Sequence, residues 1–247
     1  MRLDKYLVAQ GFFESRNRAL EAIKAGEVTV DGKTAKASQK VSEAHHIEIA
    51  QSKFYVSRAA RKLEAFLATF PLPMQGRRVL DIGSSTGGFA QILLEYPITS
   101  LNCVDVGSDQ LHHSLRSDSR LSLHEETDIR VFQPMEPFDL VTCDVSFISI
   151  LQILDDIHRL ATKDADIIIL YKPQFEVGRE AKRDSRGVVT DTTAIKEKQA
   201  HFLTETEKLG WRLLHQAPSH LAGKEGNLEY LYAFNKSQSA IMPKENP

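Results

Sequence analysis

Asp81-Ile82-Gly83-Ser84-Ser85-Thr86-Gly87-Gly88-Phe89 closes an apolar run with a group of small residues. Small residues let a chain turn sharply from a strand into a helix and let a ligand approach the backbone. The spacing is not G-x-G-x-x-G, because Ser85 stands where the second glycine would be, so a pyrophosphate site is disfavoured. Asp105 follows 24 residues after Asp81, and a carboxylate at the end of the second strand suits the two hydroxyls of a ribose. A structural turn with a helix-capping aspartate accounts for the same residues equally well.

Outward from this loop, strand patterns alternate with helical patterns. Strands are expected at 77–83, 100–106, 121–127, 138–145, 164–172, 211–219 and 227–235, and helices at 87–96, 108–116, 149–161 and 191–209. The runs DLVTCDV and DIIILYK are continuously apolar, as in parallel sheets covered on both faces. A further helix is expected in YVSRAARKLEAFLATF, with Ser57 as its N-cap. These patterns predict an α/β fold with a doubly wound, Rossmann-like sheet, in which ligands bind beyond the carboxyl ends of the strands.

The first fifty residues predict a small α+β domain. Two short helical patterns end at Gly11 and Gly26, with Ser15 as the N-cap of the second, and Val28-Thr29-Val30 runs into the hairpin signal Asp31-Gly32. Residues 1–62 hold 12 Lys+Arg and 7 Asp+Glu, a net charge of +5, whereas the rest of the chain carries −7. A basic head on an acidic body suggests a module that binds a polyanion, and chance clustering of solvated charge is the alternative.

Composition excludes several classes of protein. A chain of 247 residues with 42% hydrophobic residues can build a core without disulfide or metal. Cys103 and Cys143 lie inside apolar runs and the start MRLDKYL has no apolar signal stretch, so a reduced, cytoplasmic protein is expected. The longest apolar run spans five residues from Ile167, far short of the roughly 20 that a membrane helix needs. The nine histidines show no ligand spacing, so no metal is expected.

Ionisable residues stand at the ends of core strands or inside them. Asp144 directly follows an apolar strand, which would aim its carboxylate into the mouth of the cleft, and Lys172 ends the buried run IIILYK. Glu229 interrupts the apolar strand pattern of GNLEYLY. A buried charge is costly unless it is paired or functional. Three such groups are more than chance would give, and they mark the expected site.

Several stretches of the sequence resemble known protein families. RLDKYLV, SRNRALEAIKAGEVTVDGK and HHIEIA, in this order, resemble the small RNA-binding domain named after a protein of the small ribosomal subunit. LDIGSSTGGF followed by VDVG resembles the S-adenosylmethionine (SAM) site of class I methyltransferases. Together with SRAARKL, DVSFIS, KPQFEVG, GVVTD and GNLEYL, they resemble the TlyA family of ribosomal RNA 2′-O-methyltransferases, whose catalytic domain is FtsJ-like, over nearly the whole chain. This chain departs from the family pattern at Ser84, where alanine is common, and at Ala59 and Ala60, where glycines are common.

The TlyA resemblance implies roles for individual residues. Its catalytic tetrad corresponds to Lys62, Asp144, Lys172 and Glu229. SAM would be bound by Asp81, Gly83, Ser84, Ser85, Thr86, Gly87, Gly88, Phe89, Asp105, Val106, Asp128, Ile129 and Asp144. Asp128 would accept a hydrogen bond from the adenine amino group, or simply end a strand. RNA would contact Arg2, Lys5, Arg16, Arg18, Lys24, Arg58 and Arg61.

The implied tetrad suits methylation of a ribose. A 2′-hydroxyl is a weak acid, so its oxygen must gain nucleophilic character as it attacks the sulfonium methyl group. The Lys172 ammonium would favour the developing alkoxide, and Asp144 would keep Lys172 charged and oriented. Lys62 and Glu229 would complete an alternating ring. SAM supplies the activated group, so no metal is needed, and the enzyme's main task is positioning.

The expected organisation is an RNA-binding domain at 1–50, a linker at 51–56, a methyltransferase domain at 57–236 and a polar tail at 237–247. The expected function is SAM-dependent methylation of a ribose in ribosomal RNA, with cytidine as the base, by a cytoplasmic monomer that contacts ribosomal subunits and no membrane. The charged segment 176–189 is either an RNA clamp, through Arg179, Lys182, Arg183 and Arg186, or a solvated loop.

Other functions fit the sequence less well. A non-catalytic RNA-binding ribosome-assembly factor that keeps the fold is the main alternative, and the intact tetrad argues against it. A pore-forming haemolysin, the family's former label, would need a spanning or strongly amphipathic segment that the sequence lacks. A small-molecule methyltransferase would leave the basic head unexplained.

Overall fold

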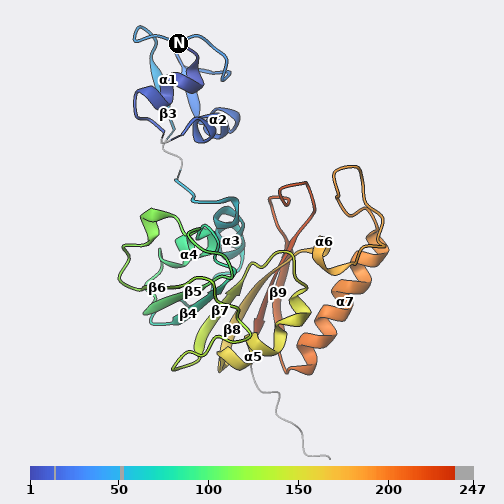
Figure 1. Ribbon diagram of the computed structural model, residues 1–247. Helices are drawn as coiled ribbons and strands as arrows, with labels where there is room; N and C mark the ends of the chain where they lie inside the picture. The colour runs from blue at the N-terminus through green and yellow to red at the C-terminus, as the bar shows by residue number, and fades with distance from the viewer. Residues whose placement is uncertain (14, 51–52, 237–247) are drawn as a thin grey trace, which may run out of the picture. The chain divides into compact units, whose positions relative to one another are not determined.

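A computed structural model describes residues 1–13, 15–50 and 53–236 of the chain. The chain divides into two compact units, one from Met1 to Phe54 and one that begins at Tyr55 (Figure 1). This division falls within the segment 51–56, where we expect a linker and of which residues 51–52 lie outside the described ones. The expected polar tail, 237–247, also lies outside them.

The first unit is a small α+β domain. It contains α1 (Leu3–Ala9), α2 (Arg16–Lys24), β1 (Val28–Val30), β2 (Lys33–Thr34) and β3 (Ile47–Ile49). The three strands form an antiparallel sheet in the order β2-β1-β3. Asp31 and Gly32 both adopt left-handed backbone angles in the turn between β1 and β2, as a tight hairpin requires. Ser15 caps α2, since its Oγ accepts a hydrogen bond from the backbone N of Arg18 at 3.4 Å.

The second unit is built on a seven-stranded sheet. Its strands are β4 (Arg78–Ile82), β5 (Ser100–Val104), β6 (Leu121–His124), β7 (Phe138–Cys143), β8 (Ala161–Tyr171), β9 (Arg212–Pro218) and β10 (Tyr230–Asn235). They lie in the order β6-β5-β4-β7-β8-β10-β9. The first five are parallel to one another, and β10 is antiparallel to both of its neighbours. The predicted doubly wound α/β fold is therefore confirmed.

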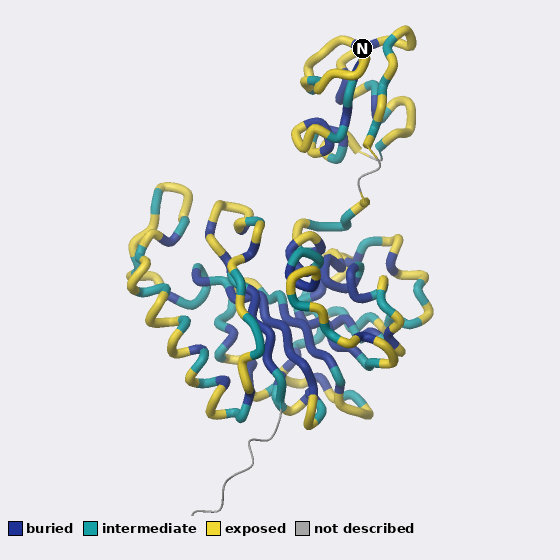
Figure 2. Tube along the Cα trace, turned by 180° about the vertical axis from the view of Figure 1, so that it is seen from behind, coloured by how far each residue is buried: buried dark blue, intermediate teal, exposed yellow. Residues whose placement is uncertain are grey.

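Helices cover both faces of this sheet. They are α3 (Arg58–Thr69), α4 (Gly88–Leu93), α5 (Leu154–Leu160), α6 (Pro173–Glu176) and α7 (Thr192–Lys208), with 3-10 turns η1 (His113–Leu115) and η2 (Ile150–Gln152). Leu63 of α3 and Phe89 of α4 belong to one apolar core, whereas Ile157 of α5 and Phe202 of α7 belong to the other. The strands between the two cores are buried on both faces, which explains their continuous apolar runs (Figure 2).

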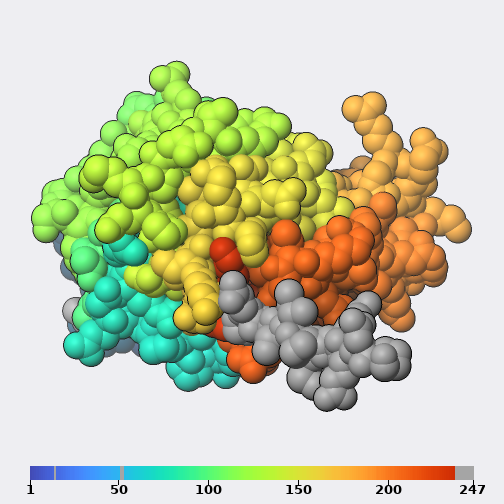
Figure 3. Space-filling model, turned by 90° about the horizontal axis from the view of Figure 1, so that it is seen from below, coloured from blue at the N-terminus to red at the C-terminus, as the bar shows by residue number. Residues whose placement is uncertain are grey.

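The two ends of the sheet differ. Where the strands begin, Arg77 and Asp166 form an ion pair of 2.7 Å between the segments of β4 and β8 (Figure 3 views the molecule from this side). Where the parallel strands end, the loops after β4, β5 and β7 and the short helix α6 after β8 come together. The parallel topology thus places the candidate site at this second end.

Some predicted elements were wrong. Residues 108–116 form no α-helix, only the turn η1, because Asp109 is left-handed and the His112 side chain accepts the backbone N–H of Ser114. The helix predicted at 149–161 is split into η2 and α5, and the strand predicted at 121–127 ends at His124, where Glu126 turns with a positive φ. Ser57 precedes α3, but its side chain makes no capping hydrogen bond. No helix within 1–13, 15–50 or 53–236 is long and apolar enough to cross a membrane.

Candidate active site

The loop between β4 and α4 approaches two other segments closely. Gly83, Ser85 and Gly87 have positive φ angles. A Cβ atom on Gly83 would lie 2.8 Å from the backbone oxygen of Asp144, and one on Gly88 would lie 2.8 Å from the Cβ of Ala59. These two positions therefore need glycine, because the loop packs against the end of β7 on one side and the start of α3 on the other.

A first hollow of about 510 Å³ opens beside this loop, at the ends of β4, β5 and β7. From the predicted cofactor residues, it is lined by Gly83, Ser85, Asp105, Val106, Asp128, Ile129 and Asp144. Asp105 Oδ2 accepts a hydrogen bond from the backbone N of Ser85 at 2.8 Å, and its Oδ1 accepts one from Gly107 N at 2.7 Å. The carboxylate is thus held in place while each oxygen keeps a lone pair. The volume lies within the range of small-molecule binding sites, roughly 300–1,000 Å³.

Asp128 lies across the same hollow and is tied to Arg130. The guanidinium donates from Nε to both carboxylate oxygens, at 2.9 and 3.0 Å. These hydrogen bonds lower the pKa of Asp128 to about 2, so the side chain is an ionised acceptor at neutral pH. Ile129 beside it belongs to the apolar core below the hollow. The Asp128 carboxylate can therefore accept a hydrogen bond from the edge of a nucleobase, and the apolar side chain of Ile129 can contact its face.

Other predicted cofactor residues lie elsewhere. Asp81 is fully buried between strands, where its Oδ1 accepts a hydrogen bond from Thr142 Oγ1 at 2.7 Å, and burial raises its pKa to about 7. Phe89 packs in the core under α3. Gly87 and Gly88 begin α4, and Ser84 and Thr86 line a second hollow. The interior positions of Asp81 and Phe89 make them supports of the loop rather than part of its surface.

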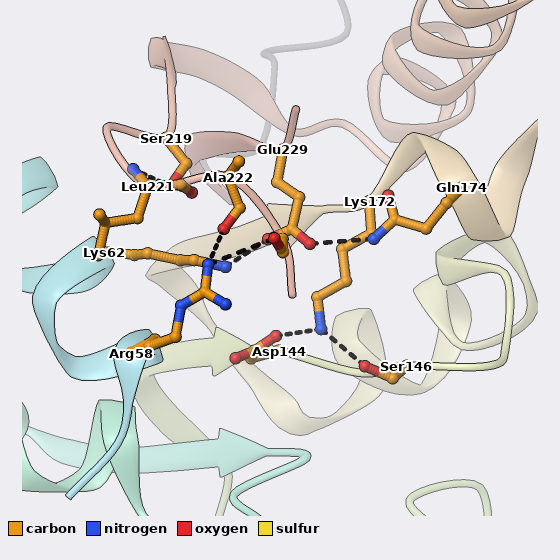
Figure 4. A network of polar contacts seen from close by, with 11 residues as sticks. Arg58, Lys62, Asp144, Ser146, Lys172, Gln174, Ser219, Leu221, Ala222 and Glu229 are labelled. Atoms are coloured by element: carbon orange, nitrogen blue, oxygen red, sulfur yellow. Dashed lines mark hydrogen bonds and ion pairs between the residues drawn. The ribbon is translucent and has the colours of Figure 1, made fainter. Parts of the chain in front are cut away.

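The second hollow, of about 730 Å³, adjoins the first and shares Gly83, Ser85, Asp144, Ser146 and Phe147 with it. All four predicted tetrad residues line it: Lys62 from α3, Asp144 after β7, Lys172 after β8 and Glu229 before β10 (Figure 4). The fold brings together residues that lie up to 167 positions apart in the chain.

The tetrad consists of two separate ion pairs. Lys172 Nζ lies 2.5 Å from Asp144 Oδ1 and donates to Ser146 Oγ at 2.8 Å. Lys62 Nζ lies 2.5 Å from Glu229 Oε2, and Gln174 Nε2 donates to Glu229 Oε1 at 3.0 Å. Within the described part of the chain, no hydrogen bond or ion pair joins one pair to the other, so the alternating ring that we expected is not closed.

The two pairs differ in exposure and in surroundings. The side chains of Lys62 and Glu229 are 8% and 3% exposed, whereas those of Lys172 and Asp144 are 11% and 15% exposed. Asp144 borders both hollows, but Lys62 and Glu229 border only the second. The Lys172–Asp144 pair therefore lies at the boundary between the two hollows, next to any ligand that occupies either of them.

Among the lining residues that the sequence did not predict, four bind the tetrad or form an aromatic rim beside it. Ser146 and Gln174 bind the tetrad directly. Phe147 has a left-handed φ of 66° and is 91% exposed, with its ring centroid 5.2 Å from that of Phe175. A large aromatic residue in this conformation is rare, and it stands on the rim shared by the two hollows. Their only sequence signal is their position in DVSFIS and KPQFEVG, beside Asp144 and Lys172.

The predicted RNA-binding residues of the first unit are partly committed to internal contacts. Arg2 Nε and Arg16 Nε donate to the buried Asp4 carboxylate at 3.0 and 2.7 Å, and Arg18 pairs with Glu21 at 3.2 Å. Arg2 and Arg16 nevertheless remain exposed, as do Lys5 and Lys24. Asp4 thus orients two arginines at the surface.

The predicted RNA-binding residues of the second unit differ in their relation to the second hollow, since Arg58 is among its lining residues and Arg61 is not. Arg58 lines it and donates to the backbone oxygens of Ala222 and, at 3.3 Å, Gly223. The Arg61 guanidinium lies 5.9 Å from the centre of the Tyr55 ring. Neither contact neutralises the positive charge.

The basic residues of the charged segment 176–189 differ in their contacts. Arg183 donates to the backbone oxygens of Gln174, Gly178 and Gly187 at 3.0 to 3.3 Å, so it holds the loop together. Arg183 and Arg186 line the second hollow. Arg179 and Lys182 are not among the residues that line either hollow.

Comparison with known proteins gives a consistent result. Residues 55–236 match the FtsJ-like methyltransferase family, and residues 1–47 match the S4 domain. A Campylobacter jejuni protein named 23S rRNA (cytidine-2′-O)-methyltransferase TlyA is 44% identical, over 96% of this chain and 100% of its own. A Mycobacterium tuberculosis protein named 16S/23S rRNA (cytidine-2′-O)-methyltransferase TlyA is 38% identical, over 98% and 93%. A solved structure from Streptococcus thermophilus, described as a candidate hemolysin, is 30% identical with a TM-score of 0.72, over 98% and 91%.

Proposed function

Since this chain belongs to the TlyA family of ribosomal RNA methyltransferases, we propose that it transfers a methyl group from SAM to the 2′-hydroxyl of a cytidine in ribosomal RNA. The observation that carries the proposal is the Lys172–Asp144 pair, 2.5 Å between Nζ and Oδ1, at the boundary of the two hollows. The catalytic residues are Lys62, Asp144, Lys172 and Glu229.

The first hollow fits the nucleoside part of SAM. Asp105 is fixed by two backbone N–H groups and can accept hydrogen bonds from both ribose hydroxyls. Asp128 can accept one from the adenine amino group, and Val106 and Ile129 offer apolar surface to the ring. Gly83 lets the loop lie against the Asp144 backbone, which a Cβ would prevent. Ser84 Oγ, beside the second hollow, is a buried polar atom without a partner in the described structure. When bound, SAM supplies a methyl group activated by a sulfonium.

The second hollow fits the target nucleotide. Lys172 Nζ donates a hydrogen bond to the 2′-oxygen and stabilises its growing negative charge. Asp144 keeps the ammonium in place, while Ser146 fixes its direction. As the bond between oxygen and methyl carbon forms and the carbon–sulfur bond breaks, the hydroxyl proton is released to water. Lys62 and Glu229 hold the far wall, where their pair is buried.

The RNA substrate also explains the rest of the chain. The S4 domain carries the exposed basic residues Arg2, Lys5, Arg16 and Lys24 and the half-buried Arg18, and cationic side chains of this kind bind phosphates. The rim of the second hollow adds Arg58, and its exposed Phe147 offers a face on which an unstacked base can lie. Because the proposed target is ribosomal RNA, we expect the protein to act in the cytoplasm. We also expect it to be a monomer.

The alternative is an RNA-binding assembly factor without activity. Such a factor would have no use for charges held at the cleft, where desolvating each ion costs several kcal/mol, on the order of 5. The buried Lys62–Glu229 pair and the partly exposed Lys172–Asp144 pair both favour catalysis.

The test is methyl transfer to ribosomal subunits from a bacterium that lacks the mark. Each subunit is incubated with the protein and with SAM carrying a tritiated methyl group, and 2′-O-methyl positions are mapped by primer extension at low nucleotide concentration. New 2′-O-methylcytidine is expected in the RNA of at least one subunit. Binding to subunits without transfer would favour the assembly factor, and a methyl group on a base would rule out ribose chemistry.

A further inference from the structure

The short helix α6, Pro173–Glu176, contacts both ion pairs. Lys172, the residue before it, binds Asp144 and Ser146. Gln174 within it donates to Glu229 Oε1 at 3.0 Å, while Lys62 holds the other oxygen of the same carboxylate. The segment from Lys172 to Glu176 therefore links two pairs that make no direct contact with each other.

Nothing within α6 itself is sufficient to hold it in place. The N–H groups at its end make short-range hydrogen bonds, from Phe175 N to Lys172 O at 3.0 Å and from Val177 N to Pro173 O at 3.1 Å. The backbone oxygen of Gln174 also accepts a hydrogen bond from the Arg183 side chain at 3.1 Å. A single helical turn is unstable alone, because fixing its backbone angles costs more than one or two hydrogen bonds return. The position of α6, and with it the direction of Lys172 and Gln174, must come from side-chain contacts to the rest of the domain.

Glu176 makes such a contact. Its Oε2 accepts a hydrogen bond from Ser149 Oγ at 2.6 Å, and its Oε1 accepts one from the backbone N of Ile150 at 2.9 Å. Both donors lie at the far end of the loop that begins with Asp144. The loop and α6 are thus joined at both ends, by Lys172 at one and by Glu176 at the other, with the Phe147 and Phe175 rings in contact between them.

The surroundings of Glu176 indicate a residue that connects two segments near the site and takes no part in the reaction. Glu176 is not among the residues that line either hollow, so it does not reach a substrate or cofactor. Burial of its carboxylate raises its pKa, and the hydrogen bonds from Ser149 and Ile150 oppose that effect. A buried carboxylate with two good donors is a rigid connection, because turning it away would leave a desolvated charge without partners.

We propose that Glu176 is a positioning residue: by binding Ser149 and Ile150 it fixes α6 and so orients Lys172 against Asp144 and Gln174 against Glu229. This role rests on the proposed methyl transfer. Because a displacement of about 1 Å at reacting groups can lower a rate about 100-fold, loss of this connection should act on kcat. It should leave the KM for RNA and the Kd for S-adenosylhomocysteine unchanged, since neither hollow loses a lining group.

The experiment compares Glu176→Ala with Glu176→Gln. Alanine removes both acceptors, and kcat is expected to fall roughly 10- to 100-fold. Glutamine keeps one acceptor for Ile150 N and can donate to Ser149 Oγ, so it should restore kcat to within about threefold of the wild type. Glu180→Ala, an exposed glutamate four residues further on, is the matched control and should match the wild type. All rates are taken well below the melting temperature of each variant.

A double-mutant cycle with Ser149→Ala tests whether Glu176 acts through the loop. Ser149→Ala alone should lower kcat less than Glu176→Ala does, and adding it to Glu176→Ala should cost nothing further. If Glu176→Ala destabilises the domain too far to assay, Ser149→Ala and Glu176→Gln still carry the comparison, because a wild-type kcat for Ser149→Ala would contradict the proposal. A wild-type kcat for Glu176→Ala, or a loss confined to KM, would also overturn it. A wild-type protein without methyl transfer would instead refute the proposed function.

Discussion

Replacing Lys172 by methionine removes a charge and keeps the length of the side chain. In the structure the Lys172 side chain is 11% exposed and its Nζ lies 2.5 Å from Asp144 Oδ1. A unit charge about 3 Å from a developing alkoxide contributes roughly 5 kcal/mol at an effective dielectric constant of about 20. Because each 1.36 kcal/mol is about tenfold in rate and solvent still reaches the pair, we expect Lys172→Met to lower kcat by about 10³- to 10⁴-fold.

The same substitution should leave cofactor binding intact. The first hollow is lined by Asp105, Asp128 and their neighbours, and Lys172 is not among its lining residues. Calorimetry with S-adenosylhomocysteine should therefore give a Kd within about twofold of the wild type, and incorporation of tritiated methyl groups into ribosomal RNA should fall near background. Lys163→Met, on the same strand but exposed, is the matched control and should change neither value.

Two results would refute this reasoning. If Lys172→Met kept more than a tenth of the wild-type kcat, the ammonium would not be stabilising the alkoxide. If cofactor affinity fell together with kcat, Lys172 would belong to the cofactor site or to the fold. A modest loss of stability is expected in either case, since Asp144 loses its partner, and thermal unfolding separates that effect from the rate.

Three further outcomes are expected. Glu229→Ala should destabilise the catalytic domain by about 3–5 kcal/mol in urea unfolding, because Lys62 stays buried without its partner, whereas the double change to Lys62→Met and Glu229→Leu should recover most of the loss. Gly83→Ala should abolish detectable binding of S-adenosylhomocysteine in calorimetry, since its Cβ would lie 2.8 Å from the Asp144 backbone oxygen at a positive φ; unaltered affinity would contradict the close approach. Asp81, whose pKa is raised by burial to about 7, is protonated in the folded state and ionised in the unfolded state between about pH 4 and 7, so its contribution to stability falls as pH rises through that range. Asp81→Asn removes this pH dependence. The free energy of unfolding of the variant minus that of the wild type, measured in urea, should therefore be greater at pH 8 than at pH 5, by about 2 kcal/mol. An equal difference between the two proteins at both pH values would show that Asp81 is not protonated in the folded state.

Local pattern was sufficient for most of the fold. Local sequence predicts the turn at Gly83 to Gly88 and the buried strands β7 and β8. Hydrophobic periodicity and turn preferences depend on residues that are neighbours in the chain. The same holds for the Asp31-Gly32 hairpin and the Ser15 cap. It fails at 108–116, where helical spacing is overridden by side chains that bond to nearby backbone groups.

The residue types of the site were also accessible from sequence, through the resemblance that singled out Lys62, Asp144, Lys172 and Glu229. Their arrangement was not. The pairing of Lys62 with Glu229 spans 167 positions, and it depends on where α3 packs and on the antiparallel insertion of β10 next to β8.

The sequence by itself therefore determined the class of fold, the basic head and the identity of the charged groups. Only the tertiary structure decided that these groups form two pairs instead of a ring, that Asp81 lies beneath the loop instead of on it, and that Glu176 joins α6 to the loop of Asp144. The physical reason is distance. Hydrogen bonds and ion pairs are short-ranged in space but not in sequence, so their partners are known only once the sheet has brought the strand ends together.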